Sequence, residues 1–200
     1  MPVKGQVLSS YFQRLAGQNE YVLDMNYLLL LFLLFCTAIF LYDYLFRRVP
    51  NRLLVMAIAV QLGWLAGSGN GLNGVTWIGA FSGLTVGLLF FLPLYTLRAM
   101  AAGDVKFFAV LGLLLGPGAL LPVFLIGSLF AGVHAVATHI LRMGLVPGLQ
   151  AVATRLVRWP LCRRVLERRG SRSGIPYAAY LAVAGAWAGM QSAGVILGIN

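Results

Sequence analysis

Six long apolar runs recur along this chain of 200 residues, and they constrain its fold more than any other feature. A membrane-spanning helix needs about 20 predominantly apolar residues. Hydrophobic residues make up 60% of the chain and charged residues 10%, whereas soluble proteins carry about 25% charged residues. The composition excludes a soluble globular domain, a disordered chain and a fibrous repeat, and it predicts an all-α polytopic membrane protein with six transmembrane helices. The predicted spans are residues 25–42, 53–67, 75–97, 105–115, 119–141 and 176–199.

The distribution of Lys and Arg predicts how these helices are oriented. Arginines follow the first, third and fifth runs, whereas the loops after the second and fourth runs carry no charge. Loops rich in Lys and Arg stay in the cytoplasm, so both termini are expected outside, in the periplasm of a bacterial inner membrane. The fourth run is short, yet we expect it to cross the membrane. If it did not, Arg98 and the basic segment 142–175 would lie on opposite sides of the membrane.

The domain organisation follows from the same pattern. Residues 1–24 form a polar N-terminal extension, and residues 25–200 form the transmembrane domain with a basic cytoplasmic loop at 142–175. This loop interleaves arginines with apolar residues, which predicts either an amphipathic helix on anionic membrane lipid or a solvated basic loop. The net charge is +10, but the apolar content argues against nucleic acid as a partner. The oligomeric state is left open.

Glycines recur at four-residue spacing in three of the predicted helices, and such stripes let helices approach closely. We expect a packing role for each stripe. The glycines are Gly63 and Gly67, then Gly79, Gly83 and Gly87, and finally Gly185 and Gly189.

Cysteine and histidine are too few and too scattered to predict a metal site or a disulfide framework. Cys36 lies in an apolar run and Cys162 in the basic loop, and His134 and His139 are five residues apart, so they do not share a helix face. No metal and no cofactor is expected.

Two carboxylates lie in the region of the membrane helices. Asp43 ends the first helix and Asp104 begins the fourth, so the predicted topology places both at the cytoplasmic boundary. An ionisable residue in a membrane helix indicates function by default, and two at one level predict a paired-carboxylate site. Two alternatives remain: Asp43 pairs with Arg47 one turn later, and Asp104 is a helix N-cap. In that case the chain is a non-enzymatic transporter or assembly subunit.

Three motifs carry a resemblance to a known family. Residues 43–51 read DYLFRRVPN, an Asp followed six residues later by a hydrophobic-Pro-Asn turn, in which Asn51 is placed to cap the next helix. Residues 101–106 read AAGDVK, and residues 175–178 read IPYA. Together they resemble the first catalytic aspartate segment, the Gly-x-Gly-Asp motif and the Pro-Tyr entry to the last helix of the prepilin leader peptidase family (type IV prepilin peptidases). Ala101 stands where the motif has its first Gly.

The resemblance implies an intramembrane aspartic endopeptidase that cleaves the leader of a type IV prepilin or pseudopilin. Larger members carry a cytoplasmic domain with paired Cys-x-x-Cys and N-methyltransferase activity. This chain has no such cysteines, so it is similar to the small Tad-type (Flp pilus) peptidases, and the resemblance does not extend to methylation. It implies that Asp43 and Asp104 are catalytic. Gly103, Lys106, Pro50 and Asn51 are expected to shape the site.

Overall fold

The computed structural model describes residues 27–143 and 175–197 of the chain. The predicted N-terminal extension 1–24 lies outside them. So does the basic loop 142–175, apart from its ends at residues 142, 143 and 175.

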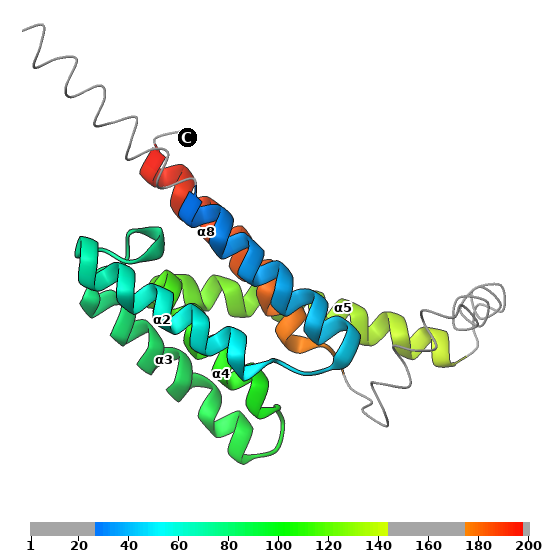
Figure 1. The fold of residues 1–200 in the computed structure, drawn as a ribbon. Helices are drawn as coiled ribbons and strands as arrows, with labels where there is room; N and C mark the ends of the chain where they lie inside the picture. The colour runs from blue at the N-terminus through cyan, green and yellow to red at the C-terminus, as the bar shows by residue number, and fades with distance from the viewer. Residues whose placement is uncertain (1–26, 144–174, 198–200) are drawn as a thin grey trace, which may run out of the picture.

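The described residues form helices and no strand, which confirms the predicted all-α class. Each of the six predicted apolar runs corresponds to one long helix, and two short 3-10 turns separate some of them (Figure 1). In chain order the elements are the helix Tyr27–Phe46, α2 (Asn51–Ser68), η1 (Leu72–Gly74), α3 (Trp77–Thr96), α4 (Ala102–Leu115), η2 (Pro117–Ala119), α5 (Leu120–Arg142) and α8 (Tyr177–Leu197).

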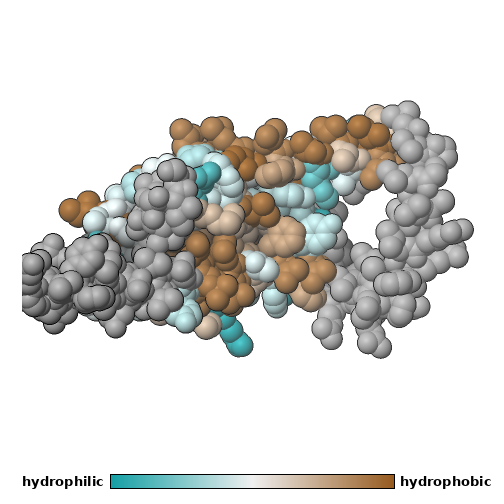
Figure 2. Space-filling model, turned by 90° about the horizontal axis from the view of Figure 1, so that it is seen from above, coloured by the Kyte–Doolittle hydropathy of each residue, from teal (hydrophilic) through white to brown (hydrophobic). Residues whose placement is uncertain are grey.

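Three of the described helices are long and apolar enough to cross a membrane: Tyr27–Phe46, Trp77–Thr96 and Pro117–Leu141. Apolar side chains also cover much of the face seen in Figure 2. These findings support a membrane protein. The count of six spans and the outside location of both termini stay predictions.

Helix α4 occupies the centre of the bundle, where it contacts α2, α3, α5 and α8 (Figure 1). Its 14 residues extend about 21 Å, less than the roughly 30 Å of a bilayer's hydrocarbon core. Every residue from Phe107 to Leu115 is buried. Because protein and not lipid surrounds α4, its backbone at either end can be irregular without facing hydrocarbon.

Glycines let α3 approach α4 at backbone contact. A Cβ atom on Gly83 would collide with the carbonyl of Gly112, and one on Gly87 would lie 3.0 Å from the Cα atom of Ala109. The predicted packing role is confirmed for these two residues. It is wrong for Gly63 and Gly67, where an added Cβ atom would meet no atom of the described residues within 4 Å, because that side of α2 is exposed.

Two amide side chains donate hydrogen bonds to carbonyl groups at the C-terminal end of α4. The last carbonyls of a helix have no intrahelical donor. Gln61 Nε2 donates to the carbonyl of Leu113 at 3.0 Å, and Asn73 Nδ2 donates to the carbonyl of Leu114 at 3.2 Å. These bonds hold α2 and the loop before α3 onto this end of α4.

The helix Tyr27–Phe46 lies beside α8 and runs antiparallel to it (Figure 1). Phe32, near the start of the first helix, packs against Gly189, near the end of α8. The last turns of the first helix therefore meet the first turn of α8, on the same side of the bundle as the start of α4.

Candidate active site

Asp43 is a buried carboxylate near the end of the helix Tyr27–Phe46, with 5% of its surface exposed. Its Oδ2 atom accepts a hydrogen bond from the backbone N–H of Ala179 at 3.0 Å. Asp43 therefore points at the first turn of α8, into the protein interior.

Asp104 is the third residue of α4 and precedes the predicted apolar span 105–115. The backbone N–H groups of Ala178 and Ala101 lie near its carboxylate and favour its charged form. Ala101 is the N-cap of α4, so the hypothesis that Asp104 is itself the cap is wrong. Asp104 lies one turn inside the helix, where a side chain can reach back to the N-cap amide.

The two aspartates lie against the same turn of α8. The amide of Ala179 donates to Asp43, and the preceding amide, that of Ala178, favours the charged form of Asp104. Burial, and next the negative charge of Asp43, raise the pKa of the Asp104 carboxyl to about 7. The structure thus brings together the two carboxylates that the sequence singled out, close enough for one to influence the other's proton.

The local sequence explains why the first backbone N–H groups of α8 are available to the aspartates. Pro176 stands directly before the first residue of α8, Tyr177, and the first four N–H groups of a helix have no intrahelical acceptor. The positive end of the helix dipole also favours negative charge there. These backbone groups were not predicted as part of the site, although the Pro-Tyr entry to the last helix was the signal that could have revealed them.

A pocket of about 310 Å³ opens beside the two carboxylates. It includes every predicted site residue except Pro50, together with two unpredicted arginines and two small neighbours. Its lining residues are Asp43, Arg47, Arg48, Val49, Asn51, Ala101, Gly103, Asp104 and Lys106.

The start of α2 differs from the prediction in its cap residue. Asn51 was predicted to cap the next helix, but it is the first residue of α2 and makes no side-chain cap bond. The N-cap is Pro50, with φ −74° and ψ 119°. The proline ring fixes an extended backbone that the helix can follow at once, so Asn51 is left to line the pocket.

Gly103 lets the start of α4 approach the loop between the first two helices. A Cβ atom on Gly103 would lie 3.3 Å from both Cβ and Cγ2 of Val49. A larger side chain would push α4 away from this loop, and with it Asp104 from Asp43. The predicted site-shaping role of Gly103 thus has a steric basis.

A second group of polar side chains lies on α5 and α8 behind the carboxylates. Ser128 Oγ and Tyr177 Oη share a hydrogen bond of 2.8 Å, and the ring centroids of His134 and Tyr180 are 5.7 Å apart. Electrostatic interactions link Tyr177 with Asp104 and Tyr180 with Asp43. The sequence did not predict these residues near the site.

The described residues contain no group of three or more His, Cys, Asp or Glu side chains placed to hold a metal ion. The donor set at the pocket is two carboxylates, with arginine and lysine beside them. Such a set can bind a water molecule between the carboxylates and hold one proton.

A sequence profile of the type IV leader peptidase family matches residues 30–136, more than half of the chain, and the match includes both Asp43 and Asp104. No curated protein and no solved structure matches the chain.

Proposed function

The chain belongs to the type IV leader peptidase family, and we propose that it is an aspartic endopeptidase acting on type IV prepilins of the Flp/Tad type. Cleavage of the leader takes place at the cytoplasmic boundary of the bacterial inner membrane and serves pilus assembly or secretion. The observation that supports the proposal is the pair Asp43 and Asp104, which lie against one turn of α8 and line one pocket.

The proposed mechanism uses one proton shared by the two carboxylates, because like charges held close do not both ionise readily. The ionised carboxylate takes a proton from water, and the protonated one donates a hydrogen bond to the scissile carbonyl. Water attacks, and a proton then passes to the leaving amine. The raised pKa of Asp104 supports assigning the shared proton to Asp104, although the two groups titrate as a pair.

The basic residues at the pocket support its location at the cytoplasmic boundary. Arg47, Arg48 and Lys106 line it, and Lys and Arg concentrate on the cytoplasmic side of membrane proteins. Long basic side chains at helix ends reach toward lipid phosphate, which fits a site at the edge of the bilayer near anionic lipid.

The competing hypothesis was a non-enzymatic transporter or assembly subunit, in which each aspartate would pair with arginine and not with the other aspartate. Membership of a peptidase family and the shared α8 turn favour the enzyme. Methyltransferase activity is not proposed, since the chain has two cysteines in all.

The direct test is co-expression with a Flp-type prepilin. Asp43→Asn and Asp104→Asn keep the shape of the side chain but remove the titrating carboxylate. We expect each to lower processing at least about a hundredfold, as loss of a general acid or base does. Asp24→Asn, a carboxylate before the first helix, is the control and should process normally. Near-normal processing by either Asp43→Asn or Asp104→Asn would remove that residue from the catalytic role.

Orientation has its own test in a background without Cys36 and Cys162. Asp43→Cys and Asp104→Cys, made together, should crosslink with a short reagent and react with thiol probes added from the cytoplasmic side. Labelling of either position from the periplasm alone would contradict the proposed topology.

A further inference from the structure

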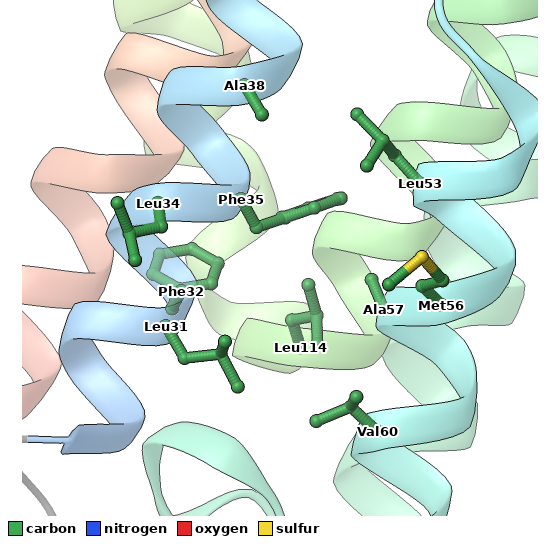
Figure 3. A pocket seen from close by; sticks show the side chains of 10 residues that line it. All are labelled: Leu31, Phe32, Leu34, Phe35, Ala38, Leu53, Met56, Ala57, Val60 and Leu114. Carbon is green, nitrogen blue, oxygen red and sulfur yellow. The ribbon is translucent and has the colours of Figure 1, made fainter.

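A second cavity, about 220 Å³ in volume, lies between the helix Tyr27–Phe46 and α2 (Figure 3). Side chains from these two helices point into it from opposite sides, and one residue of α4 lies behind them. We call it the lateral groove. Its lining residues are Leu31, Phe32, Leu34, Phe35, Ala38, Leu53, Met56, Ala57, Val60 and Leu114.

The lateral groove has a buried floor and an exposed rim. Phe32 and Leu114 at the floor are each 1% exposed, whereas Leu34 and Met56 at the rim are 57% and 62% exposed. The groove therefore opens sideways, away from the bundle core. An exposed apolar surface of this kind is typical of a site that contacts a membrane or a protein partner.

The same two helices carry the lateral groove and the carboxylate pocket. Ala38 in the groove is five residues before Asp43, about 7.5 Å along the helix. On α2, Leu53 in the groove is two residues after Asn51 in the pocket. Phe32 and Asp43 are eleven residues apart, about three turns, so they lie on one side of the helix. The groove and the carboxylate pocket therefore lie next to each other along the same two helices, with separate lining residues.

We propose that the lateral groove binds the membrane-embedded apolar segment of the peptide substrate and presents the adjoining scissile bond to Asp43 and Asp104. This inference rests on the proposed function. A chain that occupies both spaces must be apolar along the groove and polar at the pocket, where carboxylates, arginines and lysine replace aliphatic side chains. A peptide with an apolar segment next to a polar leader has this order of chemistry.

Other occupants have less support from the structure. A lipid acyl chain would fill the lateral groove without any need for the adjoining pocket, and a second copy of the chain would offer no scissile bond at the carboxylates. The position of the apolar groove and the polar pocket on the same two helices is the feature that favours a peptide substrate.

The first experiment fills the groove and compares two substrates. Ala57→Trp places an indole in the groove, and Ala59→Trp places one on the exposed side of the same helix as a matched control. The substrates are a Flp-type prepilin and a soluble peptide that spans the cleavage site without the apolar segment. Ala57→Trp should lower kcat/KM on the prepilin at least tenfold more than on the peptide, whereas Ala59→Trp should show no such difference. Equal effects of the two variants would overturn the inference.

The second experiment does not depend on how Ala57→Trp folds. A photoreactive benzophenone residue replaces Val60 in the groove or, as a control, Val55, which is 63% exposed on α2 outside the groove. Both are made in the Asp104→Asn background to retain uncleaved prepilin. Crosslinks from position 60 to the apolar segment of the prepilin, at least tenfold above position 55, support the inference. Crosslinks to lipid alone, or to a second copy of the peptidase alone, overturn it.

The two proposals fail in different ways. If the proposed function is wrong, the wild-type protein leaves the prepilin uncut or Asp104→Asn still cuts it. If the groove inference alone is wrong, the wild-type protein cuts, Asp104→Asn does not, and position 60 behaves like position 55.

Discussion

The Oδ2 atom of Asp43 accepts a 3.0 Å hydrogen bond from the backbone N–H of Ala179, 136 positions later in the chain. The preceding amide, that of Ala178, favours the charged form of Asp104. Both carboxylates therefore lie against one turn of α8, a helix that carries neither of them. This arrangement makes the start of α8 a structural part of the candidate active site.

Removing the amide donor at position 179 should impair the site without deleting a side chain from it. Ala179→Pro removes the N–H, and the first turn of a helix tolerates proline. A hydrogen bond to a charged group is worth about 1.5–3 kcal/mol, so we expect processing to fall about tenfold or more if the bond holds Asp43 in its catalytic position. Ala179→Gly keeps the N–H and is the matched control. Full activity of Ala179→Pro, with a melting temperature equal to that of the control, would show that the bond does not position Asp43.

The pH dependence of cleavage should reflect the proton on Asp104. The pKa of this carboxyl is raised to about 7, so its neutral form predominates below pH 7 and is lost as the pH rises through that value. If the neutral form donates to the scissile carbonyl, kcat/KM for the purified enzyme should fall about tenfold for each pH unit above 7. A rate that stays constant to pH 9 would contradict the assignment of the proton.

The contact between Gly103 and Val49 should be detectable as an energetic coupling. Gly103→Ala adds a Cβ atom at 3.3 Å from the Val49 side chain, and overpacking of this kind costs typically about 1–3 kcal/mol. We expect lower processing and a lower melting temperature. Val49→Ala removes the contact with Cγ2 and keeps the one with Cβ, so the double variant should recover part of both losses. Additive effects of the two substitutions would argue against the close approach.

Cleavage should proceed without metal. The carboxylates at the pocket are accompanied by arginine and lysine and not by further metal ligands, and the mechanism draws its nucleophile from water between two aspartates. Purified enzyme treated with chelator should cleave at the rate of the untreated enzyme. Inhibition by chelator that added zinc reverses would refute the proposed mechanism.

The sequence predicted the helices well, because their signal is local. Each apolar run became one helix, and the short run 105–115 became the 14-residue α4. The predicted cap residue of α2 was wrong, because the N-cap is Pro50 and the helix begins at Asn51. The expectation for Gly63 and Gly67 was also wrong, because spacing identifies a stripe of small residues but not the side of the helix that meets a neighbour.

The site was predictable in part. Five of the residues that line the pocket were chosen from sequence: Asp43, Asp104, Gly103, Lys106 and Asn51. Their catalytic and site-shaping roles stay predictions. Other groups were not chosen, because their proximity to the aspartates depends on how α5 and α8 pack. They are Tyr177, Tyr180, His134 and the first amides of α8.

The sequence by itself determined the class of the protein and its two candidate carboxylates, because hydropathy, charge and short motifs are properties of neighbouring residues. Tertiary structure decided which backbone groups lie against those carboxylates. It also decided that α4 is enclosed by protein and that a groove opens between the helix Tyr27–Phe46 and α2. Each of these depends on contacts between helices distant in sequence. Such contacts arise from the fit of whole helix surfaces, which no single run of residues encodes.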